Sequence, residues 1–272
     1  MCGIVGAITH RPVGSILLEG LQRLEYRGYD SAGFAVLDAA GEMLRLRRVG
    51  KVRELKSAQA ESGLNGIVGI AHTRWATHGK PTQQNAHPHT SGSSVAVVHN
   101  GIIENHSELR QKLREAGYNF ESETDTEVVA HLVDQKVKEQ DNLLEGFKLA
   151  LSELQGAYAI AVLHKDYPDR IVAARVGSPL VVGLGFGENF IASDPQALRP
   201  VTDRFIFLEE GELVDVTCDE ILIYGVNSLS VVDRTIKLDR DNDATDKGQY
   251  RHYMIKEINE QPDAIRATLE GR

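Results

Sequence analysis

The feature that most constrains the fold is a succession of short apolar segments in the second half of the chain. Between Gly156 and Leu238 these segments are separated by turn residues, and they include AYAIAVLH, RIVAAR, PLVVGLG, NFIASD and ILIYG. Short apolar runs bounded by turn residues are typical of buried strands. This half of the chain is therefore predicted to be mostly β-sheet, with a β-hairpin formed by FIFLEEGELVDV, residues 205–216.

The first half of the chain combines strands with helices. Strand patterns cover Ile4–Ile8, Ala32–Leu37, Met43–Val49, Ile67–His72 and Val95–His99, and we expect the last strand to stop at Asn100-Gly101. Helical spacing covers Ser15–Leu24, Ser107–Ala116, the segment after Thr124 with a capping-box pattern to Glu127, and Leu143–Leu154. The regular βαβα alternation of a parallel doubly wound sheet is missing. The sequence therefore predicts an α+β fold of layered sheets flanked by helices.

Charge and composition exclude some classes of protein. The chain has 272 residues and a formal net charge of −9. A nucleic-acid-binding protein needs a basic face, so we expect no nucleic-acid partner. No apolar run approaches the roughly 20 residues that span a bilayer, and no secretory signal is evident at the start. We therefore expect no membrane association and a cytoplasmic location.

The end of the chain differs in character from the rest. Residues 239–253 are polar and rich in turn formers, and the following segment MIKEINEQPDAIRATLEGR is predicted to be a helix interrupted at Pro262. We expect residues 1–240 to form one domain. Residues 241–272 are expected to form a linker and helix that lead to a further domain absent from this chain.

Two cysteines and four short polar stretches are candidates for chemistry. The stretches are Cys2-Gly3, HTRWATHG at 72–79, HNG at 99–101 and ETD at 123–125. Each also has a structural interpretation: a surface ion pair for Arg74, a tight turn for Asn100-Gly101 and a helix N-cap for Asp125. Cys218 is expected to be a small buried residue. His87 and His89 have no third ligand nearby, so we expect no metal site.

The four stretches together suit acyl transfer from an amide. If Met1 is removed, Cys2 carries both a thiol and an α-amine whose ordinary pKa of about 7.7–8.0 makes it a base near neutral pH. The Asn100 side-chain amide and the Gly101 N–H are adjacent donors for an oxyanion. Arg74 offers a guanidinium for an α-carboxylate, and Asp125 can accept from an α-ammonium group. These residues predict an amino-acid amide as the substrate.

Several longer motifs support this prediction. CGIVGAI, RLEYRGYDSAG, GIAHTRWATHG, VVHNGIIENH and SETDTEV resemble the N-terminal-nucleophile, or class II, glutamine amidotransferases along the whole chain. The resemblance implies a four-layer αββα sandwich. It also implies hydrolysis of L-glutamine through a γ-glutamyl thioester on Cys2, without a cofactor.

The resemblance also implies roles for individual residues. Cys2 matches the nucleophile, Asn100 and Gly101 match the oxyanion hole, and Arg74 and Asp125 match the substrate clamp. Trp75, Thr77 and His78 match a mobile loop that closes over glutamine, while Arg27 matches an arginine near the terminal amine. The chain is expected to be inactive until Met1 is removed.

Within this family, RLEYRGYDSAG, SDPQALRPVTDRFIFLEEGE and YRHYMIKEINEQP are most similar to the members that act on fructose 6-phosphate. The resemblance implies that a second domain, absent here, uses the ammonia to convert fructose 6-phosphate into glucosamine 6-phosphate, and that the full-length protein is a homodimer. Two alternatives stay open. One is the glutaminase half of another class II enzyme, such as an amidophosphoribosyltransferase, and the other is a catalytically silent glutamine-binding module.

Overall fold

We describe the protein from a computed structural model, which covers residues 2–38, 40–75, 79–225, 234–238, 250 and 253–269. The chain divides into two compact units, Met1–Leu238 and Asp239–Arg272. The first unit contains two antiparallel sheets, and the second contains helix α7 (Tyr253–Leu269). Among the described residues, no helix is long and apolar enough to cross a membrane.

The larger sheet in the first unit has eight strands and holds the N-terminal strand near its centre. Strand β1 is hydrogen-bonded to β10 on one side and to β4 on the other. From edge to edge the strands are β14 (Ile236–Lys237), β11 (Arg204–Phe207), β9 (Val181–Leu184), β10 (Asn189–Ala192), β1 (Gly3–Ile8), β4 (Val68–Arg74), β2 (Ser31–Leu37) and β3 (Met43–Val49).

The smaller sheet has six strands, and its longest strands are β6 and β7. From edge to edge it contains β13 (Ile221–Tyr224), β12 (Leu213–Val216), β8 (Ile171–Val176), β7 (Gly156–His164), β6 (Val95–Ile103) and β5 (His89–Ser91). Both sheets are antiparallel throughout the described pairs.

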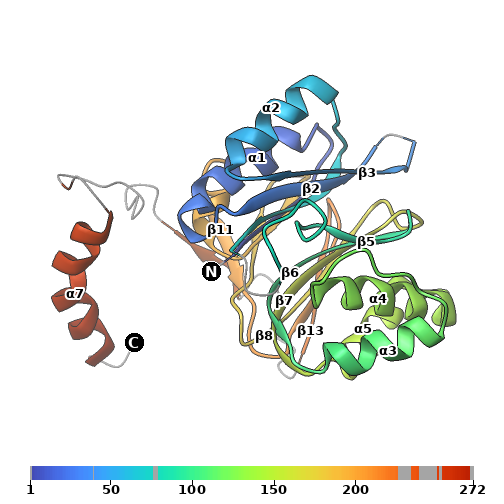
Figure 1. Ribbon diagram of the computed structural model, residues 1–272. Helices are drawn as coiled ribbons and strands as arrows, with labels where there is room; N and C mark the ends of the chain where they lie inside the picture. The colour runs from blue at the N-terminus through green and yellow to red at the C-terminus, as the bar shows by residue number, and fades with distance from the viewer. Residues whose placement is uncertain are drawn as a thin grey trace. The chain divides into compact units, whose positions relative to one another are not determined.

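Helices cover the outer faces of both sheets, which gives four layers (Figure 1). Helices α1 (Gly14–Leu24) and α2 (Val52–Ser62) lie on the eight-stranded sheet. Helices α3 (His106–Glu115), α4 (Thr126–Gln140) and α5 (Leu143–Glu153) lie on the six-stranded sheet. Short 3-10 helices η1 (Glu25–Arg27) and η2 (Pro195–Leu198) complete the unit. The predicted αββα sandwich is confirmed.

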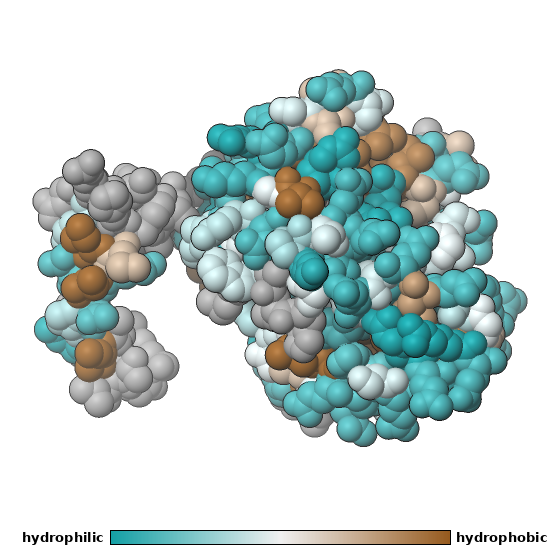
Figure 2. Space-filling view, in the orientation of Figure 1, coloured by the Kyte–Doolittle hydropathy of each residue, from teal (hydrophilic) through white to brown (hydrophobic). Residues whose placement is uncertain are grey.

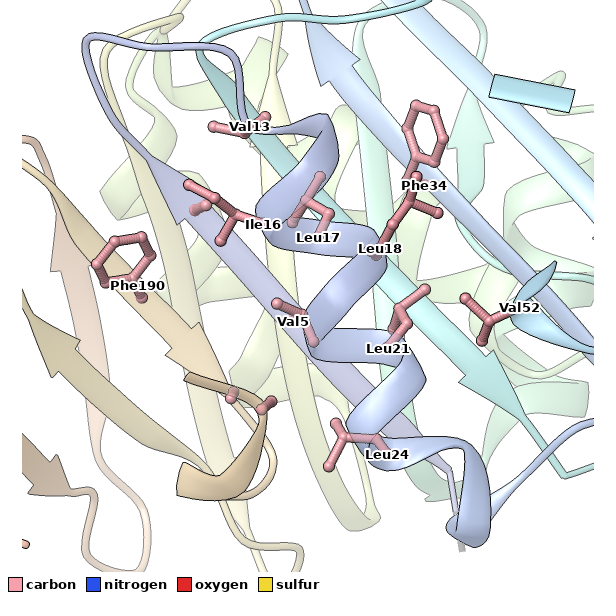
Figure 3. Packing of buried hydrophobic residues seen from close by; sticks show 14 of the residues in the cluster. Val5, Val13, Ile16, Leu17, Leu18, Leu21, Leu24, Phe34, Val52 and Phe190 are labelled. Carbon is pink, nitrogen blue, oxygen red and sulfur yellow. The ribbon is translucent and has the colours of Figure 1, made fainter. Parts of the chain in front are cut away.

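Strand β1 is apolar on both faces because its alternating side chains pack into two different core clusters. Val5 and Ala7 pack with helix α1 in one core cluster, while Ile4 and Ile8 pack in the cluster between the two sheets. Figure 3 shows the helix side of this packing, with Val5 beneath α1. A third cluster joins α4 and α5 to the six-stranded sheet. Because β1 is buried on both faces, the residue before it is held next to the core.

Two predictions about the strands are wrong. Segment 205–216 is not a hairpin, because β11 pairs with β9 and β14 whereas β12 pairs with β8 and β13. The chain crosses from one sheet to the other between these strands, and both contribute to the apolar layer between the sheets. Strand β6 does not stop at Asn100-Gly101. It continues to Ile103, because β7 pairs with it as far as Gly156.

The helices also differ from prediction in places. Helix α2 was not predicted. The capping box from Thr124 is absent, because Glu127 accepts instead from the backbone N–H groups of Glu121 and Ser122. Helix α7 runs through Pro262 without interruption. Apolar side chains, including exposed Met254 and Ile258, gather on α7 (Figure 2).

Candidate active site

A cavity of about 270 Å³ lies where parts of both sheets and helix α4 meet. All the predicted site residues that the structure describes line this cavity. Its walls are formed by Cys2, Arg27, Arg74, Trp75, His87, His99, Asn100, Gly101, Ile102, Thr124, Asp125, Thr126, Ser178 and Pro179. Thr77 and His78, also predicted to bind substrate, lie outside the described residues.

Cys2 directly precedes β1 and is fixed by the pairing of that strand. Gly3 pairs with Thr73 of β4, so the register brings Cys2 to the end of β4 where Arg74 lies. The backbone N–H of Trp75 donates to the Cys2 Sγ over 3.2 Å. Burial raises the pKa of the Cys2 thiol, while this hydrogen bond and the positive charge of Arg74 act in the opposite direction.

Asn100 and Gly101 lie within β6, on the other sheet from Cys2. The Asn100 Nδ2 donates to the Cys2 backbone carbonyl over 3.2 Å, and its Oδ1 lies 3.0 Å from the His72 Nε2. Gly101 has a φ of +130°, a conformation that L side chains rarely adopt. A Cβ at this position would lie 2.0 Å from the Ala157 carbonyl oxygen of β7. Only glycine fits here, at the point where β6 passes the cavity.

Arg74 and Asp125 supply opposite charges at the cavity wall. Arg74 ends β4, is only 4% exposed, and has Nη atoms 3.4 Å from the carbonyl oxygens of Lys80 and Gly79. Burial lowers its pKa, while the nearby charges of Cys2, Asp30 and Asp125 favour the protonated guanidinium. Asp125 precedes α4, but its side chain does not cap that helix.

The Asp125 carboxylate is held by the neighbouring sheet instead. Its Oδ2 accepts the backbone N–H of Ile103 over 2.9 Å, and the same oxygen lies 3.9 Å from the His99 Nδ1. The carboxylate therefore has a fixed position although it lies in a connecting segment.

Arg27 and Trp75 lie at the cavity in different settings. Arg27, the last residue of η1, pairs with Asp194. Trp75 follows β4, is 44% exposed, and packs edge-on against Tyr29 with ring centroids 5.6 Å apart. An aromatic side chain at the rim of a cavity is suited to cover a bound molecule.

His87 and His89, which were considered as metal ligands, both contact threonine hydroxyls. His87 Nε2 lies 2.9 Å from the Thr126 hydroxyl, and His89 Nε2 lies 3.0 Å from the Thr124 hydroxyl. No cluster of three potential metal ligands occurs in the described part of the chain. Cys218 is a free thiol, as is Cys2, and it is half-buried, whereas a buried residue was predicted.

Three residues that organise the site were not predicted from the sequence. His72 contacts Asn100, Asp194 pairs with Arg27, and Asp30 contributes negative charge near Cys2 and Arg74. His72 and Asp30 lie inside motifs that were quoted for other residues. Asp194 likewise lies in the quoted motif SDPQALRPVTDRFIFLEEGE, and it also accepts the Gln196 N–H at the start of η2.

The cavity thus combines a thiol, an amide donor next to a glycine N–H, a guanidinium and a carboxylate. The family profile described as "Glutamine amidotransferase domain" matches residues 72–200. This chain carries a glutamine amidotransferase domain. The match begins at His72 and includes Arg74, Asn100, Gly101 and Asp125.

Curated relatives of this amidotransferase domain extend the match to the whole chain. The glutamine–fructose-6-phosphate aminotransferases (isomerizing) of Pseudomonas putida and Escherichia coli K12 are 57% and 58% identical to it over 272 residues. The chain spans 44% of the length of each of these relatives.

Solved structures agree with the fold. The glutamine phosphoribosylpyrophosphate amidotransferase of B. subtilis, complexed with ADP and GMP, matches with a TM-score of 0.71 and 27% identity, over 82% of this chain and 49% of that one. A glutamine aminotransferase class-II domain protein from Silicibacter pomeroyi matches with a TM-score of 0.56 at 15% identity, over 82% of this chain and 98% of that one. The second match supports the fold alone.

Proposed function

We propose that this amidotransferase domain hydrolyses L-glutamine to L-glutamate and ammonia, with Cys2 as the nucleophile after removal of Met1. The observation that carries the proposal is the single cavity shared by Cys2, Asn100, Gly101, Arg74 and Asp125. These groups match the parts of an amino-acid amide: a reacting carbonyl, an α-carboxylate and an α-ammonium.

The reaction proceeds through a thioester. The Cys2 α-amine takes the thiol proton, and the sulfur attacks the side-chain amide carbon of glutamine. The carbonyl oxygen becomes an oxyanion that accepts from the Asn100 Nδ2 and the Gly101 N–H. The C–N bond then breaks as the protonated α-amine gives its proton to the leaving nitrogen, which departs as ammonia. Water attacks the thioester, releases glutamate and restores the thiol.

Asn100 is suited to this role by its present contact. A primary amide has two N–H donors, so donation to the Cys2 carbonyl leaves one donor for an oxyanion beside the sulfur. In the proposal, the Arg74 guanidinium binds the α-carboxylate and Asp125 binds the α-ammonium group. We also propose that Trp75, Thr77 and His78 close over the substrate and that Arg27, which pairs with Asp194 and lines the same cavity as Cys2, acts near the Cys2 amine.

For the longer protein we propose amination of fructose 6-phosphate to glucosamine 6-phosphate. The names of the relatives at 57–58% identity support this substrate over a phosphoribosyl substrate, whose enzyme matches at 27%. In this proposal residues 1–240 are the glutaminase domain, and residues 241–272 connect it to a sugar-phosphate domain of a homodimer.

The test combines intact-mass spectrometry with a glutamate-release assay. The processed protein should lack Met1, release glutamate, and gain one adduct at Cys2 from 6-diazo-5-oxonorleucine. Cys2→Ser should lose both activity and adduct. Cys218→Ser, which removes the other free thiol, should keep both.

Two results would count against the proposal. A processed protein that takes no adduct and releases no glutamate would support the silent binding module instead. A protein with an acetylated Cys2 amine that still hydrolyses glutamine at full rate would exclude that amine as the base.

A further inference from the structure

His72 connects the two sheets directly beneath the oxyanion amide. It lies on β4 of the eight-stranded sheet and is completely buried. Its Nε2 lies 3.0 Å from the backbone carbonyl of His99 and 3.0 Å from the Asn100 Oδ1, both on β6 of the other sheet. Residues two apart on a strand share a face, so His72 and the cavity residue Arg74 point the same way from β4.

The contacts fix the tautomer of His72. A backbone carbonyl only accepts, so the Nε2 atom that faces the His99 carbonyl carries a proton. The His72 Nδ1 has no hydrogen-bond partner within the described residues. Burial lowers the pKa of His72 to about 3, so the ring is neutral at physiological pH and Nδ1 is unprotonated.

The same contacts fix the orientation of the Asn100 amide. Because Nε2 donates, the Asn100 atom facing it is the oxygen. The amide nitrogen then faces the carbonyl of Cys2, which also only accepts. Two backbone carbonyls, one at each end of this chain of hydrogen bonds, therefore determine which way the amide points.

The His72 ring is itself held from behind. It stacks on the buried ring of His87, with centroids 4.1 Å apart and planes 26° from parallel. The His87 Nε2 lies 2.9 Å from the Thr126 Oγ1, and that hydroxyl lies 3.0 Å from the His99 Nδ1. Thr126 is the first residue of α4 and follows Asp125, so the ring is braced by the helix that begins beside the substrate clamp.

We propose that His72 is a positioning residue for the oxyanion hole, whose Nε2–H holds Asn100 with its N–H groups toward Cys2. The inference rests on the proposed glutaminase function. The terminal torsion of an asparagine has two broad orientations. Without the His72 donor, only the bond to the Cys2 carbonyl restrains that torsion, so a larger share of molecules presents the amide oxygen to the cavity. An oxygen at that position repels the oxyanion, and each flipped molecule is unable to stabilise the transition state.

The test compares His72→Leu, which has no donor, with His72→Gln, whose amide N–H can donate to the Asn100 Oδ1. We expect His72→Leu to lower kcat by about 10- to 100-fold, less than removal of an oxyanion donor itself. KM for glutamine should change by less than about threefold, and His72→Gln should recover most of kcat. His164→Leu is the matched control, because it removes a buried strand histidine outside the cavity and should leave kcat and KM unchanged.

A double-mutant cycle separates positioning from general damage to the fold. In an Asn100→Ala background, His72→Leu should have little further effect on kcat, since the residue it positions is absent. A multiplicative loss in the double variant would overturn the inference. So would equal kcat values for His72→Leu and His72→Gln, or a rise in KM with kcat unchanged.

A spectroscopic readout distinguishes this inference from the proposed function. Long-range ¹H–¹⁵N spectra of the histidine rings, with His72 assigned by its loss in His72→Gln, should show the Nε2–H tautomer. An active wild-type protein with the Nδ1–H tautomer would overturn only the role of His72. A processed wild-type protein that releases no glutamate would overturn the proposed function, and the role of His72 in it, whatever the tautomer.

Discussion

The backbone N–H of Trp75 donates a hydrogen bond to the Sγ atom of Cys2 over 3.2 Å, across 73 positions of sequence. A donor to sulfur stabilises the thiolate, so this bond opposes the burial that raises the pKa of the thiol. Because the donor belongs to the backbone, a change of the Trp75 side chain leaves it in place.

Two replacements of Trp75 therefore separate the effect of its backbone N–H on the Cys2 thiol from that of its side chain. We expect Trp75→Pro, which lacks the N–H, to raise the pKa of the Cys2 thiol above that in Trp75→Ala. The measurement is the rate of iodoacetamide alkylation against pH in a Cys218→Ser background, with circular dichroism to confirm folding. Identical profiles for the two folded variants would show that the hydrogen bond has no influence on the thiol.

Loss of the Arg74 guanidinium should weaken glutamine binding. Arg74→Ala is expected to raise KM for glutamine by about 10- to 100-fold, with a smaller change in kcat, because charge-assisted hydrogen bonds contribute about 1.5–3 kcal/mol. Arg170→Ala is the control, since Arg170 pairs with Asp215 and does not line the cavity. An unchanged KM in Arg74→Ala would mean that another group binds the α-carboxylate.

Asn100→Ala should have the opposite kinetic pattern. Removal of one oxyanion donor is expected to lower kcat by about 10²–10³-fold and to change KM far less. Steady-state glutamate release at varied glutamine concentration measures both constants. Equal losses in kcat and in binding would argue that Asn100 contacts the substrate in its ground state.

Substitution of Gly101 tests whether β6 requires a glycine at this position for stability. Gly101→Ala combines a φ of +130° with a Cβ only 2.0 Å from the Ala157 carbonyl oxygen, so it should lower the free energy of unfolding by more than about 3 kcal/mol. Gly117→Ala is the matched control, with a φ of +92° and no atom within 4 Å of the added Cβ. Its expected cost is about 1 kcal/mol. Similar urea midpoints for the two variants would contradict the close approach.

Acid should destabilise the fold through its buried histidines. Burial lowers the pKa of His72, His87, His89 and His99, so the unfolded chain binds protons below about pH 6.5 that the folded chain does not. The free energy of unfolding therefore falls as pH drops below 6.5, by about 1.4 kcal/mol per pH unit for each such histidine.

One substitution pair measures this effect. His89→Gln removes a fully buried histidine, whereas His10→Gln removes an exposed one. Urea unfolding at pH 7.5 and pH 5.5 should show a smaller loss of stability on acidification in His89→Gln than in the wild type. His10→Gln should match the wild type. An unaltered acid sensitivity in His89→Gln would show that His89 is protonated in the folded state.

Elements with a strong local signal were predictable. The strand predicted at Ile4–Ile8 is β1 (Gly3–Ile8), and the helix predicted at Ser15–Leu24 is α1 (Gly14–Leu24). Both were predictable because the spacing of apolar residues within a segment indicates whether it forms a buried strand or a helix. The partner of a strand has no comparable local signal. The turn residues between β11 and β12 suit a hairpin as well as a crossing between sheets, so only the distant pairing partners decide.

The site residues likewise fall into those with a local sequence signal and those without one. Cys2, Arg74, Asn100, Gly101 and Asp125 were predicted as site residues because each lies in a motif with its own chemistry, and all five line the cavity. His72 was not predicted, because its role depends on its contact with Asn100 on another strand. The sequence around a histidine in a buried strand does not identify that partner. That strand, β6, begins more than 20 residues later in the chain and belongs to the other sheet.

Cys2 adjoins the eight-stranded sheet and Asn100 belongs to the six-stranded one, and among the described strands no backbone ladder joins the two sheets. The distance between the Cys2 sulfur and the Asn100 amide consequently depends on the apolar layer between the sheets, where Ile4 and Val98 pack, as well as on the hydrogen bond from Asn100 to the Cys2 carbonyl. If the proposed reaction is correct, removal of a methyl group from Ile4 or Val98 should therefore change its rate, although neither residue lines the cavity.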